Sequence, residues 1–346
     1  MRRAILILVI LFVLAIPVNA TEISAPEPPP EAEAYLPEES ASFGEDLWYI
    51  FKSATKELQP SLAEAASVCL GVIVTVILIS ILQNYSPSAK GVSEFAGTVA
   101  LGLILFGPMN SLVELGTSTI RQVSEYGKLL LPVMTTAMAA QGGTTTAAAL
   151  YTGTAFFDSL LSSAITQVLI PMLYAYLCVC LAYSAIGEGV LNTLRQLLKW
   201  LITWGLKIIL YVFTGYISIT GVVSGTTDAA AMKAAKLTIS GAVPVVGGIL
   251  SDASEAVLVS AGVLKNSVGV YGFVAITAIL IGPFLKIGAQ YLILKVTGGI
   301  CSSFPSGRLP EIVKDFTGAM GLLLAMTGTV SLLLLISLVC FMRGIG

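Results

Sequence analysis

The sequence contains no histidine and few charged side chains. Its 346 residues include 18 Lys and Arg and 20 Asp and Glu, so charged residues make up 11% of the chain, whereas a typical soluble domain has about 25%. The absence of histidine removes the commonest metal ligand and the usual general base at neutral pH. A net charge of −2 gives no basic field for nucleic acid. Walker, zinc-ligand and GxSxG motifs are also absent, so we expect no enzyme, no cofactor or metal, and no nucleic-acid partner.

Charged residues are missing altogether from several long stretches. A bilayer core about 30 Å thick needs roughly 20 apolar residues of helix to cross it, and a soluble fold of this size has too little interior to bury many such helices. The longest stretches without Asp, Glu, Lys or Arg are 65–89, 95–113, 129–157, 159–187, 208–227, 266–285 and 316–342. The sequence therefore predicts an all-α, polytopic membrane protein, with 61–346 as its transmembrane domain.

Within this domain we expect six uninterrupted spans and two interrupted segments. The spans are 62–83, 92–113, 156–186, 200–223, 271–293 and 318–342. The interrupted segments are 129–154 and 226–269, and their helix-breaking residues are Pro132, Gly142, Gly143, Pro244, Gly247 and Gly248. We interpret both segments as half-helices or re-entrant hairpins, because irregular backbone at that depth must be shielded from lipid by protein or water.

The first residues have the pattern of a secretory signal peptide. Arg2 and Arg3 precede an apolar stretch that is too short to span a bilayer comfortably, and Pro17 then interrupts it. The small residue Ala20 follows at the position where a signal peptidase would cut. We predict a signal peptide over 1–20 that is cleaved after Ala20, with an uncleaved membrane anchor as the alternative.

Two further segments lie between the signal peptide and the transmembrane domain. Residues 21–46 contain five prolines, eight acidic residues and no basic residue, which predicts an extended linker outside the cytosol. Apolar residues recur at helical spacing through 47–60, including Trp48 and Phe51. This pattern predicts an amphipathic helix at the membrane interface, although an ordinary packed helix end would give the same pattern.

Six polar residues lie within or beside apolar segments, and each needs a partner or water. A charge at the centre of a membrane helix costs about 2.5–3.5 kcal/mol on insertion scales. Asp252 and Glu255 share a helix face, and Lys265, ten residues or close to three turns further on, could face the same cavity. We predict a polar lining or gate built by the two interrupted segments; alternatively, these residues mark helix ends at the interface. The candidates are Asp158, Lys207, Asp252, Glu255, Lys265 and Asn266.

The stretch 226–269 also carries a family resemblance. Its characteristic residues are Thr227-Asp228, Lys233-Ala234-Ala235-Lys236, Val243-Pro244-Val245, Asp252-Ala253 and Leu264-Lys265-Asn266-Ser267-Val268-Gly269. This stretch resembles the stage III sporulation protein AE family of endospore-forming bacteria. The predicted signal peptide, the acidic segment and the polytopic domain agree with that family in layout.

The resemblance implies a function, a location and partners. It implies a subunit of the sporulation channel that links the mother cell to the engulfed forespore. The location would be the multi-pass cell membrane of the mother cell around the forespore. The partners would be other stage III sporulation membrane proteins, ring-forming proteins and a secretion-type ATPase, and the family offers no catalytic residues to transfer.

Two other functions stay open from the residues alone. Interrupted segments in corresponding halves of a chain are typical of secondary transporters with a site at the bilayer midplane. The chain would then be a stand-alone transporter or permease. The second alternative is a non-conducting scaffold that holds the other channel proteins together.

Overall fold

The computed structural model describes residues 25–37, 42–242 and 247–343, with the helical backbone alone for 221–265. Every regular element in these residues is a helix, as the apolar pattern predicts; the predicted signal peptide lies outside them. The long helices are α3 (Phe43–Tyr85), α4 (Lys90–Ala140), α5 (Thr144–Ala164), α6 (Ile170–Ile186), α7 (Gly189–Ala242), α8 (Gly247–Cys301) and α9 (Leu309–Arg343). The short elements are α2 (Pro30–Glu33), η1 (Pro87–Ala89) and η2 (Ile165–Leu169).

The helices α5 and α6 are two parts of one long helix. They are joined without a turn by η2, which is a single π-helical stretch. Pro171 follows η2 in the first turn of α6. Proline lacks an N–H and its ring crowds the carbonyl four residues earlier, so the wider π turn accommodates it without ending the helix.

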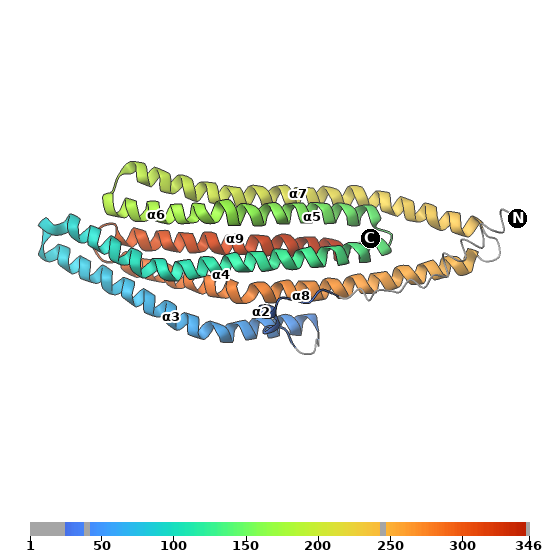
Figure 1. Ribbon diagram of the computed structural model, residues 1–346, viewed down its shortest axis with the longest axis horizontal. Helices are drawn as coiled ribbons and strands as arrows, with labels where there is room; N and C mark the ends of the chain where they lie inside the picture. Colours follow the sequence, from blue (N-terminus) through green and yellow to red (C-terminus); the bar gives the residue numbers. More distant parts are fainter. Residues whose placement is uncertain (1–24, 38–41, 243–246, 344–346) are drawn as a thin grey trace.

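Six helical stretches in the described residues are long and apolar enough to cross a membrane, which confirms the predicted number of spans. They are Phe43–Tyr85, Lys90–Ala140, Thr144–Ile186, Gly189–Thr220, Asn266–Cys301 and Leu309–Met342. Because the number is even, the beginning of α3 and the end of α9 lie toward the same end of the bundle (Figure 1). Three connections, 86–89, 187–188 and 302–308, lie at the opposite end, which we call the loop end.

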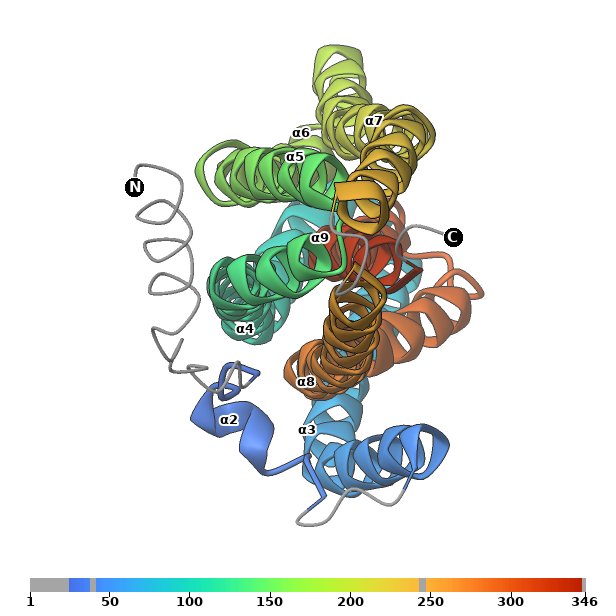
Figure 2. The ribbon, with the colours of Figure 1, turned by 90° about the vertical axis from the view of Figure 1, so that its right-hand side faces the viewer.

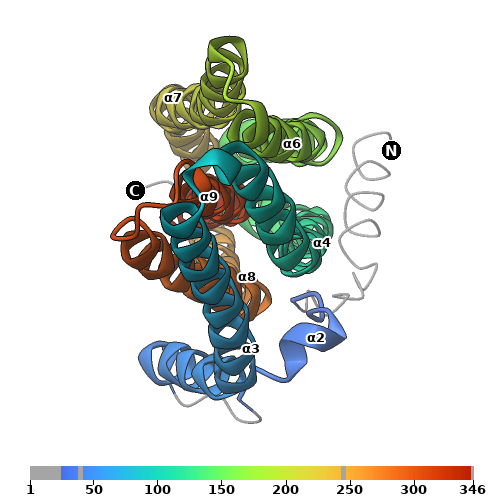
Figure 3. The ribbon, with the colours of Figure 1, turned by 90° about the vertical axis from the view of Figure 1, so that its left-hand side faces the viewer.

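The last helix, α9, forms the centre of the bundle. Figures 2 and 3 show it surrounded by α4, α5, α7 and α8. Between 316 and 342 it has no charged residue on any face, and a helix that is apolar all round is either buried among other helices or in contact with lipid. Its side chains with at most 1% exposure include Phe316, Met320, Leu323, Met326, Val330 and Leu333.

The first interrupted segment contains one helix break rather than two. α4 continues through Pro132 to Ala140, so the expectation that Pro132 breaks the helix is corrected. Proline removes one backbone hydrogen bond, and contacts with neighbouring helices can outweigh that loss in a long packed helix. The chain turns instead at Gly142, whose φ of 94° is a left-handed conformation that glycine adopts without a steric penalty. Gly143 then caps α5.

This turn joins two long helices. α4 has 51 residues, and α5 continues through η2 into α6 as a stretch of 43 residues. Half-helices or a short re-entrant hairpin over 129–154 are therefore not observed. Figure 1 shows α4 and α5 running side by side in opposite directions from the turn.

The second interrupted segment also separates two long helices. α7 ends at Ala242 and α8 begins at Gly247, so Gly247 and Gly248 lie in the first turn of α8, whereas Pro244 lies outside the described residues. α7 has 54 residues and α8 has 55, which corresponds to about 80 Å each at 1.5 Å per residue. Both helices exceed a hydrocarbon core of about 30 Å, and their adjoining ends project past α4, α5 and α9 (Figure 1).

The N-terminal part of the chain packs along this bundle. Residues 47–60 are helical, as expected, and they continue directly into the first span within α3. Pro60 lies inside this helix, and Figure 3 shows the first turns of α3 at an angle to the rest. Residues 25–37 of the predicted linker pass beside α8 with α2 at their centre, and Ala32 is 2% exposed.

Candidate functional site

Asp158 on α5 is a buried carboxyl group inside the bundle. The residue is 2% exposed. Its Oδ2 atom accepts a hydrogen bond from the Ser124 hydroxyl of α4 at 2.6 Å, whereas Oδ1 has no hydrogen-bond partner among the described residues. The turn at Gly142 causes this pairing, because Ser124 lies about five helical turns before it and Asp158 about four and a half turns after it. The contact therefore depends on the antiparallel register of α4 and α5.

A second polar contact lies one helical turn from Asp158. Thr154 is 0% exposed, and its hydroxyl lies 2.7 Å from the Ser337 hydroxyl of α9. Nearby, Tyr216 of α7 donates a hydrogen bond to the Ala149 carbonyl at 2.9 Å, and its ring covers Gly153 so closely that a Cβ there would overlap it. Hydroxyl groups thus hold α5 against both α9 and α7.

A cluster of charged side chains lies near the loop end. Arg195 of α7 donates to Asp315 of α9 at 2.7 Å and lies 3.4 Å from Glu311. Tyr176 of α6 donates to the second Asp315 oxygen at 3.2 Å. The Arg195 guanidinium also lies 4.6 Å from the centre of the Tyr183 ring, which is a favourable cation–π distance. This group, which we call the Arg195 cluster, joins α6, α7 and α9.

A loop closes over the same end of the bundle. The backbone N–H of Arg308 donates to Glu94 of α4 at 2.9 Å. The Arg308 guanidinium lies against Gly187, where a Cβ would overlap it. Gly187 ends α6 with a φ of 82°, which a residue with a side chain rarely adopts. These contacts connect the loop between α8 and α9 to both α4 and α6.

The N-terminal segment, residues 25–37, is bound to the bundle away from the loop end. The Tyr35 hydroxyl donates a hydrogen bond to Glu57 of α3, and Glu57 lies 4.0 Å from the ammonium group of Lys286 on α8. The Tyr126 hydroxyl of α4 donates to the Pro26 carbonyl at 3.4 Å. Burial of the phenol, and secondarily its hydrogen bond to Glu57 and that residue's charge, raise the pKa of Tyr35.

The structure does not bring the described candidates for the polar lining into one cavity. Asp158 is buried against Ser124, whereas Lys207 is exposed on α7. Asn266 lines a pocket of about 670 Å³ beside the N-terminal segment, together with Leu36. The side chains of the other three candidates lie outside the described residues, so the lining itself stays a prediction; these are Asp252, Glu255 and Lys265.

The Arg195 cluster and the Ser124 contact are absent from the sequence-based predictions. Glu311 and Asp315 are four residues apart and therefore share a helix face, which was the available signal for a cationic partner. Nothing in the sequence distinguishes Ser124 from the other helix serines. Among the described residues, no group of three His, Cys, Asp or Glu side chains could hold a metal ion. The chemistry that these polar groups support is hydrogen bonding and charge pairing between helices.

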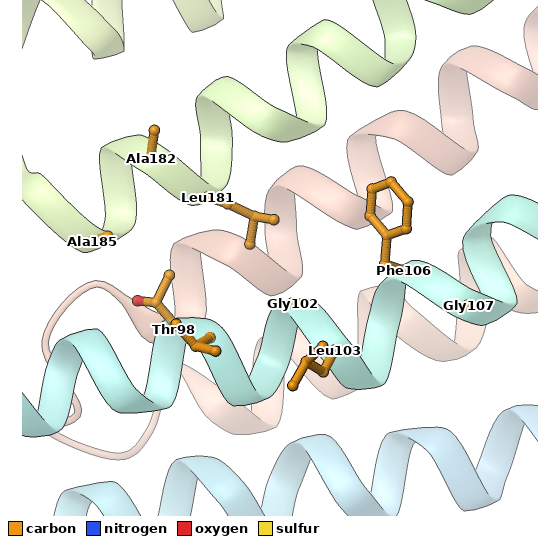
Figure 4. A pocket seen from close by; sticks show the side chains of 9 residues that line it. Thr98, Gly102, Leu103, Phe106, Gly107, Leu181, Ala182 and Ala185 are labelled. Carbon is orange, nitrogen blue, oxygen red and sulfur yellow. The ribbon is translucent and has the colours of Figure 1, made fainter.

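An apolar groove opens between α4 and α6 near the loop end (Figure 4). Its volume is about 610 Å³, and small residues such as Gly102 and Ala185 form part of its lining. Figure 4 shows Leu181 extending from α6 toward α4. Leu103, at the edge of the groove, is 77% exposed. In a bilayer, such a surface contacts lipid chains or another transmembrane helix.

Comparisons with known proteins agree with the resemblance in 226–269. A curated protein of Bacillus subtilis (strain 168), named stage III sporulation protein AE, is 22% identical over 265 residues, which are 76% of this chain. The chain covers 66% of that relative, slightly less than two thirds of its length. No solved structure matches. The family model for stage III sporulation protein AE matches residues 37–344, which include all six apolar helices, and the chain therefore belongs to the stage III sporulation protein AE family.

Proposed function

We propose that this chain is a membrane subunit of the channel that links the mother cell to the forespore, and that forespore development requires it. The observation that carries the proposal is the family match over residues 37–344, which covers the whole described bundle except its N-terminal segment. Membership of this family makes the chain a sporulation-related protein, and its six apolar helices make it a membrane protein. The channel role is the further step that we propose.

The packing of the bundle supports a subunit rather than a stand-alone transporter. Transporters of the interrupted-helix type bind substrate at the midplane between half-helices, whereas the break at Gly142 joins two long helices. Described polar side chains such as Asp315 and Thr154 bond to other helices of the same chain. We therefore place the passage between this chain and its partners, with the exposed groove between α4 and α6 as one surface for them.

We propose the mother-cell membrane around the forespore as the location. The partners would be other stage III sporulation membrane proteins, ring-forming proteins and a secretion-type ATPase. The lengths of α7 and α8 support contacts with proteins outside the bilayer, because about 80 Å of helix extends well past a core of about 30 Å.

Reconstitution in liposomes tests the subunit proposal against the transporter alternative. The purified chain alone is expected to give no flux of small fluorescent solutes or metabolites above empty liposomes, and flux is expected only when the partner membrane and ring proteins are added. Flux through the chain alone would reject the proposal and favour the transporter.

A second experiment separates a channel subunit from a scaffold. Leu103→Trp enlarges an exposed side chain at the groove, and Ile219→Trp makes the same change at a 67% exposed position on α7. We expect Leu103→Trp to reduce flux while the ring proteins still co-purify with the chain, and Ile219→Trp to leave flux unchanged. If assembly is normal and both variants fail to alter flux, the groove does not contribute to the passage. If a full set of assembled partners shows no flux at all, the scaffold is favoured.

A further inference from the structure

Asp158 has too few hydrogen-bond partners for a buried carboxylate. An ionised carboxylate has about four acceptor sites on its two oxygens. Here one oxygen receives the Ser124 hydroxyl at 2.6 Å, and the other has no partner among the described residues, although the residue is 2% exposed. A buried charge without partners is strongly disfavoured, and the group instead becomes neutral.

The helices around Asp158 supply little compensating charge. On α4, the exposed Lys128 interacts electrostatically with Asp158. The neighbouring stretch of α7, 208–227, contains no Asp, Glu, Lys or Arg, and its nearby titratable group, Tyr216, donates a hydrogen bond to the Ala149 carbonyl. On α9 the stretch 316–342 is equally free of charged residues.

The titratable residue of that α9 stretch is Cys340. The Ser337 hydroxyl of α9 lies 2.7 Å from the Thr154 hydroxyl of α5. Lys128 is the charged group that acts on Asp158, and it does so from a position open to the surroundings. The buried surroundings of Asp158 are therefore hydroxyl and apolar groups rather than cations.

We propose that Asp158 is a proton-binding site inside the bundle and that it carries its proton at neutral pH. With the proton on Oδ2, the carboxyl group donates to the Ser124 hydroxyl oxygen across the same 2.6 Å contact. Oδ1 is then a neutral carbonyl oxygen, and leaving a neutral acceptor unpaired costs less than leaving a charged one unpaired.

This site would couple protonation to the packing of α4 against α5. Loss of the proton leaves a negative charge between the two helices, so that they must separate or admit water to solvate it. Acidic and neutral conditions thus favour the closed arrangement of the structure, whereas alkaline conditions oppose it. The inference does not depend on the proposed channel role, because it concerns this chain alone.

Infrared spectroscopy of the full chain in detergent tests the proposal. A protonated carboxyl group gives a carbonyl stretching band that a carboxylate lacks and that shifts in heavy water. At pH 7 we expect this band in the wild type and in the control Asp315→Asn, whose carboxylate is paired with Arg195, but not in Asp158→Asn. A wild-type spectrum identical to that of Asp158→Asn in this region would overturn the proposal.

Two further measurements keep the test decisive. Ser124→Ala removes the hydrogen-bond partner but keeps the acid, so it should retain the band at a shifted frequency, which assigns the band even if Asp158→Asn does not fold. Between about pH 4 and pH 9, the unfolding temperature should fall with rising pH more steeply in the wild type than in Asp158→Asn, because the unfolded Asp158 carboxyl loses its proton near pH 4. If Na⁺ stabilises the wild type at neutral pH when K⁺ does not, and Asp158→Asn abolishes that difference, the site binds a metal cation and the proton proposal fails.

Discussion

The two best-buried carboxyl groups of helices α5 and α9 are held in opposite ways. Asp315, whose side chain is 14% exposed, faces the Arg195 guanidinium at 2.7 Å and also accepts from Tyr176. Asp158 is 2% exposed and is held by one serine hydroxyl. The first arrangement neutralises a charge with a partner, whereas the second provides no partner of opposite sign among the surrounding buried groups.

Position along the bundle explains this difference. Arg195 and Asp315 each lie about two turns from the beginning of their helices, close to the loop end, where long side chains can reach water. Asp158 lies in the interior, where Thr154 and Ser337 form an uncharged pair. Desolvating a hydroxyl costs far less than desolvating an ion, so hydroxyl groups connect the interior around Asp158, whereas the loop end can also hold charged pairs.

Breaking the charged arrangement should have the largest effect. Asp315→Asn leaves Arg195 with Glu311 as its remaining carboxylate, at 3.4 Å. We expect a loss of about 3 kcal/mol in unfolding free energy, because removing one partner of a buried ion pair is strongly destabilising and Glu311, whose side chain is 45% exposed, compensates Arg195 only weakly. Denaturant unfolding of the wild type and Asp315→Asn in detergent measures this loss. The double variant Arg195→Met with Asp315→Leu should recover part of the loss, because it removes both charges; no recovery would mean that the loss does not come from the charge left on Arg195.

Crowding the hydroxyl region should have the next largest effect. In Gly153→Ala the new methyl group overlaps the Tyr216 ring, which must move away from the Ala149 carbonyl. We expect a loss of about 2 kcal/mol, as for other overpacked interiors, measured by thermal unfolding. Gly215→Ala on α7 is the control, because a Cβ there meets nothing within 4 Å. Equal stabilities for the two variants would contradict the close Tyr216 contact.

Removing the uncharged partner should cost less than removing the charged one. Ser124→Ala leaves both Asp158 oxygens without a described side-chain partner. We expect a loss of about 1–2 kcal/mol at neutral pH, which is typical for one buried hydrogen bond left unmade. Denaturant unfolding of Ser124→Ala and Asp315→Asn under the same conditions compares their two losses of unfolding free energy. If Ser124→Ala proves the more damaging of the two, the contrast between the two carboxyl groups is wrong.

Removing the hydrogen bond from Tyr35 to an exposed carboxylate should have the smallest effect on stability, and that effect should depend on pH. Tyr35→Phe removes the hydrogen bond to Glu57, whose side chain is 49% exposed, and we expect a loss of about 0.5–1 kcal/mol. Folding raises the pKa of Tyr35, mainly through burial. Its contribution is therefore fully present below the ordinary tyrosine pKa of about 10 and declines as pH rises above it.

Unfolding measured from pH 7 to pH 11 checks this prediction. The wild type should lose its advantage over Tyr35→Phe in the upper part of that range. A constant difference between the two proteins across the range would show that the Tyr35 phenol does not ionise with unfolding.

Much of the architecture was predictable, but few of its contacts were. The six spans follow from local composition, since a long apolar segment without charges can be recognised as a span from its own residues alone. The turn at Gly142 was likewise predictable, because glycine alone readily adopts its backbone conformation. The effect of Pro132 was not, because neighbouring helices decide whether a long helix survives a proline.

The candidate site shows the same limit. Asp158 could be identified from the sequence as a costly polar residue, yet its partner Ser124 could not, since the pairing depends on how α5 folds back along α4. The Arg195 cluster combines side chains of three helices. Asp315 is more than a hundred residues away in the sequence from both Arg195 and Tyr176. Taken singly, the charged residues of the cluster resemble those found beside any loop.

The sequence by itself determined that the chain is a bundle of long apolar helices and where most of those helices end, because length, charge and glycine act within a few residues. Tertiary structure decided that α9 is central, that the N-terminal segment docks beside α8, and which polar groups meet. Such pairings arise between residues far apart in the chain. They depend on the register of packed helices, which no single helix contains.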